Sequence, residues 1–292
     1  MKTRTSPWAY LFIAPAIAVF LIFSIIPTIY TFVISTFKWN ELNPAKSKFI
    51  GLDNYARALS GDAIPNFWNT MWVSFIFVFA IVVLGTGLSL FLAFLMREST
   101  SLMLAARASV FLAHITPLVA TSMIWIWIFN PRFGLLNGVL GALGFDPVDW
   151  LGGNHSAMVS IIIFTLWHEV GFTTIIFVGG MTTLSKELHE AAILDGASRV
   201  TEFFRVTVPQ LIPYIVFVMV TSSVASLHAF TQFFMLTGGG PDYRTATLGF
   251  QVYEQAFVLR HTGYAAALAV VLFLISLALT LVQLQVNKRM RT

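Results

Sequence analysis

The sequence contains no cysteine among its 292 residues. This absence excludes a disulfide framework, a Cys-ligated zinc site and iron–sulfur chemistry. Charge is also scarce, since only 10% of the residues are Asp, Glu, Lys or Arg, and the 17 basic and 13 acidic residues leave a formal net charge of +4. Because these charges are scattered over loops and chain ends without a basic block, nucleic acid is not an expected partner.

Two kinds of chemical signature are missing as well. No Gly-x-x-x-x-Gly-Lys-Ser/Thr phosphate loop occurs, so ATP hydrolysis is not expected on this chain. The six histidines show no His-x-x-x-His spacing, which argues against a metal site. The Gly-rich segment 238–241 lacks the Lys of a phosphate loop and is expected to form a tight turn on the outer side. The sequence therefore predicts no catalytic centre, no cofactor and no metal.

Apolar residues dominate what is present. They make up 57% of the chain, and the mean hydropathy is +0.81, far from the average of soluble domains. About 20 apolar residues are needed for a helix to cross a hydrocarbon layer about 30 Å thick. Six stretches qualify, at about 8–36, 70–96, 108–129, 157–180, 210–236 and 263–285. We predict an all-α polytopic membrane protein, a single transmembrane domain over 1–292 with six helices.

Prolines and basic residues refine this prediction. Pro15, Pro27 and Pro117 lie inside predicted spans and indicate bends rather than breaks in the membrane. With both termini inside, the inner segments carry ten Lys and Arg residues against seven outside, which favours cytoplasmic termini. The first apolar run is too long for a signal peptide, so we expect it to remain as an anchor.

The segment between the fourth and fifth predicted spans, 181–209, concentrates charge between two apolar stretches. Apolar residues repeat at helical spacing from Met181 to Ala192, which predicts a short amphipathic helix. Gly196 can take the left-handed conformation that ends a helix, and a second helix is expected from Ser198 to Val206, before Pro209. We predict a cytoplasmic helix–turn–helix.

The residues of this segment resemble the EAA loop of the permease subunits of bacterial binding-protein-dependent ABC importers. The matching positions are Glu190-Ala191-Ala192, Asp195-Gly196-Ala197, an aromatic at Phe203 or Phe204, Pro209 and Pro213. Further short stretches resemble the carbohydrate-type branch of that family, at 49–55, 69–70, 125–129, 134–137, 238–241 and 264–267. Their order along the chain extends the resemblance over nearly its whole length.

The resemblance implies a type I ABC importer permease fold in the bacterial plasma membrane. It also implies four kinds of partner: a second homologous permease, two ATP-binding subunits that hold the ATP and magnesium, an extracytoplasmic solute-binding protein, and the lipid bilayer. The residues that would couple to the ATPase are Glu190, Ala191, Ala192, Asp195, Gly196 and Ala197. Without the resemblance, an ordinary amphipathic loop on the membrane surface, with Glu190 solvated, would explain the same pattern.

A substrate path should appear as polar and aromatic groups at membrane depth, because an ionisable residue at the bilayer centre costs about 3 kcal/mol. Glu169 lies near the middle of the fourth span, beside His168. We expect it to share a low-affinity sugar cavity with Trp167, Ser222, Ser226, His228, Phe230 and Gln232. Ser222, Ser226 and Gln232 are predicted near one helical face. The alternative is that these polar groups only join helices to one another.

Carbohydrate import is therefore the favoured function. A glycerol-phosphate-like compound or another polar solute is the alternative within the family. Outside it, the pair His168 and Glu169 could relay protons in an ion- or proton-coupled secondary carrier. The sequence offers no further acids or bases spread along the other predicted spans, which argues against that carrier.

Overall fold

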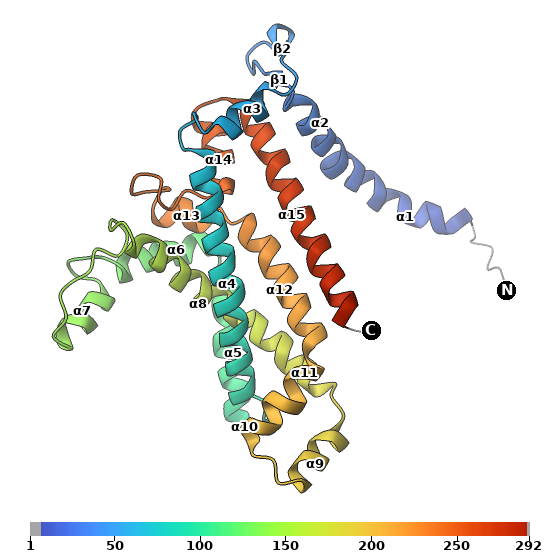
Figure 1. Cartoon of the computed structure of the whole chain (residues 1–292), viewed down its shortest axis with the longest axis vertical. Helices are drawn as coiled ribbons and strands as arrows, with labels where there is room; N and C mark the ends of the chain where they lie inside the picture. The colour runs from blue at the N-terminus through green and yellow to red at the C-terminus, as the bar shows by residue number, and fades with distance from the viewer. Residues whose placement is uncertain (1–6, 291–292) are drawn as a thin grey trace. The chain divides into compact units, whose positions relative to one another are not determined.

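The computed structural model describes residues 7–290, with side chains described for all of them except 7–11, 186, 189 and 286–290. The terminal segments 1–6 and 291–292, on which part of the orientation prediction depends, lie outside the described residues. Helices form nearly all of the regular structure (Figure 1). The chain separates into two compact units. One contains the residues up to Phe67 together with Gln251–Leu274, and the other contains Trp68–Phe250 together with the residues from Ile275 onward.

The first unit contains a long apolar helix followed by a small polar assembly. Its elements are α1 (Pro7–Phe20), a π-helical turn (Leu21–Ile25), α2 (Ile26–Ile34), β1 (Phe37–Lys38), a 3-10 turn (Pro44–Lys46), β2 (Lys48–Phe49), α3 (Asp53–Ser60), a second π-helical turn (Glu254–Val258) and the first half of α15 (Thr262–Met290). The strands pair antiparallel, with Phe37 opposite Phe49. The first π-helical turn ends two residues before Pro27, which has no backbone N–H to donate to the preceding helical turn.

Asn54 and Tyr55 organise the polar assembly of the first unit. Asn54 Nδ2 donates to the carbonyl oxygens of Ser35 at 2.8 Å and Phe37 at 3.0 Å. The hydroxyls of Ser35 and Tyr55 are 2.6 Å apart. These bonds join α3 to the end of α2 and to β1, which gives a physical role to the sequence stretch 49–55.

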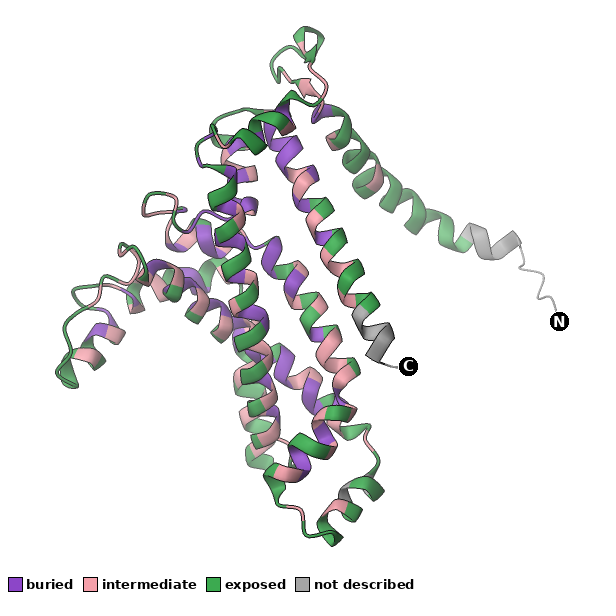
Figure 2. Cartoon of the chain, viewed as in Figure 1, coloured by how far each residue is buried: buried purple, intermediate pink, exposed green. Residues whose placement is uncertain are grey.

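The second unit contains the other helices. They are α4 (Phe67–Leu95), α5 (Ser101–Ile115), α6 (Leu118–Ile128), α7 (Leu135–Ala142), α8 (Ser156–Thr182), α9 (Lys186–Leu194), α10 (Arg199–Glu202), a π-helical turn η3 (Phe203–Thr207), α11 (Val208–Gln210), α12 (Ile212–Leu227) and α13 (Thr231–Leu236). Helix α14 (Leu248–Tyr253) follows the Gly-rich turn. Helix α8 is the most buried of the long helices, as Figure 2 shows.

A cluster of buried aromatic side chains forms the core of this unit. Phe77 from α4, Phe164 from α8 and Phe233 from α13 are fully buried, and the rings of Phe77 and Phe233 lie 4.7 Å apart. Apart from Asn69 near its start, the exposed side chains of α4 are apolar, among them Trp72 and Phe79. A helix that is apolar on both faces, with one face uncovered, suits a lipid environment.

Within the described part of the chain, four helices are long and apolar enough to cross a membrane, or up to six when each of two sharply bent pairs counts as one span. The four are Phe12–Ile34, Phe67–Leu95, Ser156–Thr182 and Thr262–Gln285. They overlap the predicted stretches 8–36, 70–96, 157–180 and 263–285. The arrangement with six spans stays a prediction.

The stretches 108–129 and 210–236, each predicted as one helix, are both divided. Helices α5 and α6 meet at 101°, where Thr116 is extended before Pro117. A residue before proline avoids the helical conformation, so the predicted bend is a complete break. In the other stretch, α12 ends at Leu227 and α13 begins at Thr231, with His228 outside both helices.

Candidate functional site

The predicted helix–turn–helix is present, and Gly196 forms its turn. Helix α9 ends with a motif in which Ala197 N donates to Ala192 O at 3.0 Å and Gly196 N donates to Ile193 O at 3.0 Å. This pair of bonds requires a left-handed residue after the helix, and Gly196 has φ +78°. The predicted role of Gly196 as the helix end is thereby confirmed.

The helix before this turn begins later than the sequence suggested. Helix α8 continues to Thr182, so Met181 belongs to it, and α9 starts only at Lys186 after the extended residue Ser185. The apolar pattern from Met181 to Ala192 thus spans two helices. A continuous hydrophobic spacing cannot show a break between helices when the residues on both sides are apolar.

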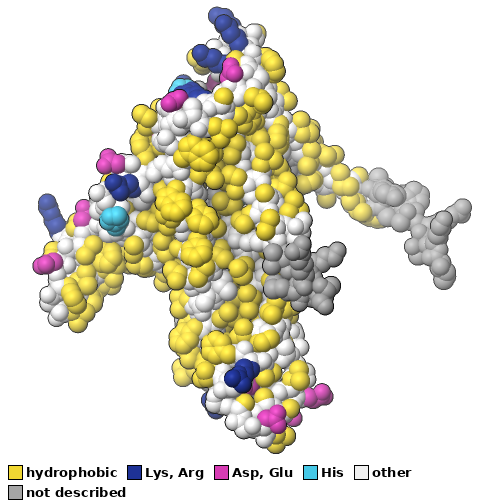
Figure 3. Space-filling view, viewed as in Figure 1, with side chains coloured by type: hydrophobic (Ala, Val, Ile, Leu, Met, Phe, Trp, Pro, Cys, Tyr) yellow, Lys and Arg dark blue, Asp and Glu magenta, His cyan; other side chains and the backbone are white. Residues whose placement is uncertain are grey.

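Helix α9 presents an uncovered surface. Glu190, Ala191 and Asp195 are exposed, Ala192 and Ala197 are half-buried, and Leu194 is 87% exposed. Figure 1 shows α9, α10 and α11 together at one end of this unit. Figure 3 shows charged side chains of both signs gathered at that end, whereas apolar side chains cover α4 and α5. An exposed helix with apolar and acidic groups is suited to contact another protein.

The second half of the loop is firmly held. Ser198 caps α10 by accepting a hydrogen bond from Thr201 N at 3.2 Å. The Glu202 carboxylate is only 3% exposed and accepts from Arg97 Nη1 at 2.8 Å and from Thr207 Oγ1 at 2.6 Å. Arg97 follows the end of α4, so this ion pair ties the loop to that helix. A buried carboxylate needs such partners because charge is costly away from water.

A pocket of about 470 Å³ opens beside this ion pair. Its lining includes both charge pairs of the region, Arg97 with Glu202 and Arg199 with Glu98, together with Ala197 from the turn. Arg199 and Glu98 are 3.6 Å apart and are both well exposed. The pocket lies between the Gly196 turn and the end of α4.

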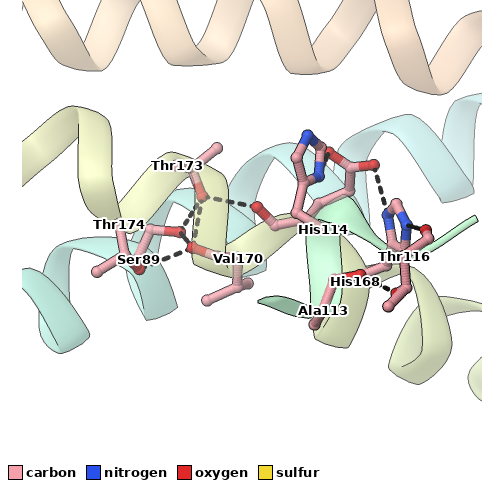
Figure 4. A network of polar contacts seen from close by, with 9 residues as sticks. Ser89, Ala113, His114, Thr116, His168, Val170, Thr173 and Thr174 are labelled. Atoms are coloured by element: carbon pink, nitrogen blue, oxygen red, sulfur yellow. Dashed lines mark hydrogen bonds and ion pairs between the residues drawn. The ribbon is translucent and has the colours of Figure 1, made fainter. Parts of the chain in front are cut away.

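A second polar group lies midway along α8 (Figure 4). His168 Nδ1 is 3.2 Å from Glu169 Oε1, and His114 Nδ1 from α5 is 3.6 Å from Glu169 Oε2. His168 Nε2 lies 3.3 Å from the carbonyl oxygen of Thr116, which can only accept. His168 therefore donates through Nε2 and joins the break after α5 to α8.

The three side chains place their ligand atoms within 4.8 Å of one another, a separation at which a metal ion could be held. Sequence spacing could not reveal this group, because His114 and His168 come from different helices. His168 and Glu169 are consecutive on α8 and are hydrogen-bonded to each other, whereas His114 Nδ1 is buried and has no hydrogen-bond partner. The absence of a metal site stays a prediction.

The other predicted path residues fall into separate groups. Trp167 is partly exposed, and its ring lies 5.4 Å from that of Trp125 on α6. Ser226 and Gln232 are buried, and Ser222 and Phe230 are half-buried. His228 is exposed, with Nε2 3.1 Å from Ser276 Oγ. The two serines share one face of α12, but Gln232 does not, because the helix ends before it.

Some polar contacts at this depth join helices, as the alternative to a substrate path predicts. Gln283 Nε2 from α15 donates to Ser223 Oγ on α12 at 2.9 Å. Ser89 on α4 is hydrogen-bonded to Thr173 on α8 and donates to the Val170 carbonyl oxygen at 3.3 Å. Ser223 and Ser89 therefore hold helices together rather than face a path.

The sequence did not predict the structural roles of two groups, the pair of Arg97 and Glu202 and the side chain of Asn137. The pair of Arg97 and Glu202 joins residues 105 positions apart, and no local pattern marks such a contact. Asn137 has a buried amide that donates to the carbonyl oxygens of Pro131 and Val148 and accepts from Val148 N and Trp150 Nε1, at 2.8 to 3.1 Å. It holds the segment between α6 and α8.

Comparison with known proteins agrees with this geometry. Residues 85–292 match the sequence model of a family described as "Binding-protein-dependent transport system inner membrane component". The trehalose/maltose transport system permease protein MalF of Thermococcus litoralis is 32% identical over 99% of this chain and 96% of its own length. The sulfoquinovosyl glycerol transport system permease protein SmoG of Agrobacterium fabrum is 31% identical over 95% of this chain and 89% of its own.

The fold is shared with a solved structure as well. A chain of a bacterial alginate ABC transporter, crystallised in complex with an alginate pentasaccharide-bound periplasmic protein, superposes with a TM-score of 0.85. The superposition covers 97% of this chain and 94% of the other, at 22% sequence identity. Similarity at this level of identity concerns the fold.

Proposed function

The chain belongs to the family of binding-protein-dependent transport system inner membrane components, the permeases of ABC importers, and on that basis we propose that it imports a carbohydrate. A permease of this kind is a multi-pass inner membrane protein without enzymatic activity. It acts with ATP-binding subunits and a solute-binding protein.

The observation that carries the coupling proposal is the exposed helix α9 with its Gly196 turn. Glu190 and Asp195 are exposed on it beside uncovered apolar side chains. We propose that this surface sits in a cleft of the ATPase, with Glu190 facing a basic group there. Closure of two ATPases on ATP then displaces α9. Truncation of one member of such a buried pair costs about 2–5 kcal/mol, because the other charge is left unpaired.

The carbohydrate proposal draws support from the relatives and from the residues at membrane depth. The names of MalF and SmoG refer to the transport of trehalose/maltose and of sulfoquinovosyl glycerol, respectively. In this chain, Trp167 offers an aromatic face and the partly exposed Glu169 offers hydrogen-bond acceptors. We propose that these two residues, with Ser222, Ser226, His228, Phe230 and Gln232, contribute to a weak path for sugar hydroxyls.

We also propose both termini in the cytoplasm, six spans and a second homologous permease as partner. The charge count of ten against seven supports the orientation. The loop of α9 to α11 lies between the fourth and fifth predicted spans, and a coupling role requires it on the side of the ATPases. A second permease would complete a path of which this chain supplies half.

Crosslinking tests the coupling proposal directly. Because the chain has no cysteine, a single Glu190→Cys substitution places one reactive thiol on α9. In membranes holding the whole transporter, a short thiol reagent should join it to the ATP-binding subunit, and ATP with vanadate should change the yield. A matched Leu42→Cys variant, exposed in the first unit before α3, should give no such product. Equal yields at both positions would refute the docking of α9.

A further inference from the structure

The two halves of the coupling loop differ in how they are held. Helix α9 is largely uncovered, whereas α10 and the π-helical turn η3 are tied to the end of α4 by buried contacts. We propose that Phe94, Arg97, Glu202, Phe203 and Thr207 form a joint that carries displacement of the loop into α4. We call this group the α4 joint. The inference rests on the proposed coupling function.

Glu202 is the centre of the α4 joint. One oxygen of its carboxylate accepts a hydrogen bond from Arg97, at the end of α4, and the other accepts one from Thr207, at the end of η3. One side chain therefore joins α4 to both ends of the π-helical turn. Since an unpaired charge at 3% exposure is strongly unfavourable, α10 cannot move away from α4 without breaking a costly pair.

Aromatic packing strengthens the same connection. The Phe94 and Phe203 rings are 4.7 Å apart, and the Arg97 guanidinium lies 5.1 Å from the Phe94 ring centre. Phe203 is buried, whereas the neighbouring Phe204 is exposed. The guanidinium is thus held by an aromatic face and by a carboxylate at once, which fixes its direction. Arg97 and Glu202 act as positioning residues, because neither is placed on the surface that would meet the ATPase.

The second charge pair of this region supplies a matched control. Arg199 belongs to the same short helix as Glu202, and Glu98 follows Arg97 in sequence. Their separation is 3.6 Å, with side chains 80% and 57% exposed. Exposed pairs of this kind contribute little because water screens them. Loss of this pair should leave the transmission of motion to α4 intact.

Two fluorescent reporters separate docking from transmission. In the chain without cysteine, Leu194→Cys labels exposed α9, and Leu95→Cys labels the exposed end of α4. In the complete transporter, ATP with vanadate should change both signals. In a Glu202→Gln background the α9 signal should persist, while the α4 signal should fall at least about fivefold, the lower range of coupling between distant sites.

The control background and the exchanged pair complete the test. Arg199→Gln should leave both signals at the level of the parent protein. Arg97→Glu combined with Glu202→Arg should restore at least about half of the α4 signal, because the opposite charges meet again. Should Glu202→Gln prevent assembly, this exchanged pair decides: an assembled complex without α4 signal contradicts the joint.

The outcomes distinguish this inference from the proposed function. An α4 signal in Glu202→Gln equal to that of the parent would overturn the joint while leaving coupling by α9 in place. An α9 signal that does not respond to ATP even in the parent complex would overturn the coupling function itself. Proportional loss of both signals in Glu202→Gln would indicate damage to docking and would likewise contradict the joint.

Discussion

The contact of α5 with α8 at Gly171 gives the sharpest prediction for stability. A Cβ at position 171 would lie 1.9 Å from the carbonyl oxygen of Val110 on α5. Carbon and oxygen atoms normally stay about 3.4 Å apart, so Gly171→Ala requires the helices to separate by about 1.5 Å. Excess volume in a packed interface costs about 1–3 kcal/mol, and backbone on both sides offers no side chain that can turn away.

Gly179 provides the control on the same helix. It lies two turns further along α8, and a Cβ there would meet nothing within 4 Å. Thermal unfolding of the purified protein in detergent, followed by fluorescence of its 8 tryptophans, compares the two variants. Gly171→Ala should lower the midpoint by several degrees relative to Gly179→Ala. Equal midpoints would show that α5 and α8 do not pack as closely as the structure has them.

The displacement also reaches the polar group at membrane depth. His114 Nδ1 on α5 and Glu169 Oε2 on α8 are 3.6 Å apart. His114 lies four residues from Val110 on α5, and Glu169 lies two residues from Gly171 on α8. A shift of about 1.5 Å between these helices would take the pair beyond the distance of an ion pair. Gly171→Ala should therefore reduce transport more than Gly179→Ala at equal amounts of protein in the membrane.

Three further predictions concern the coupling loop and the segment between α6 and α8. Gly196→Ala strains a residue with φ +78° by about 1 kcal/mol, and should reduce ATP-driven uptake more than Ala197→Gly. Glu190→Ala should weaken copurification of the ATP-binding subunit, whereas Glu187→Ala, earlier on α9, should weaken it less. Asn137→Ala removes four buried hydrogen bonds, so it should expose Trp150 to a soluble quencher of tryptophan fluorescence, which Asn130→Ala should not.

Much of the fold was predictable because lipid imposes a simple pattern. Long apolar runs located helices α4, α8 and α15. The membership in the carbohydrate-uptake type of ABC transporter permeases, inferred from the loop residues and from short stretches along the chain, is confirmed. The helical class and the type I importer fold are confirmed as well. Gly196 was predictable because only a left-handed residue ends a helix in this way.

What escaped prediction depends on contacts between distant residues. Hydropathy cannot distinguish one span from two helices, so the bend predicted at Pro117 proved to be a 101° break, and the interruption at His228 was not predicted. For the predicted substrate path, this means that Gln232 does not share a helical face with Ser222 and Ser226, because Gln232 belongs to α13. The ion pair of Arg97 and Glu202 was not predicted, because it joins the end of α4 to α10 and these segments are far apart in the sequence.

The energy source of uptake tests the central claim most directly. The transporter would be assembled in proteoliposomes from this chain, its partner permease, its ATP-binding subunits and its solute-binding protein, with labelled trehalose as the first of a panel of sugars. We predict that uptake requires ATP on the side of the membrane opposite the solute-binding protein. Uptake should stop when this ATP is removed while the membrane potential is held. Sugar uptake that continues on the potential alone would contradict it and would favour an ion-coupled carrier.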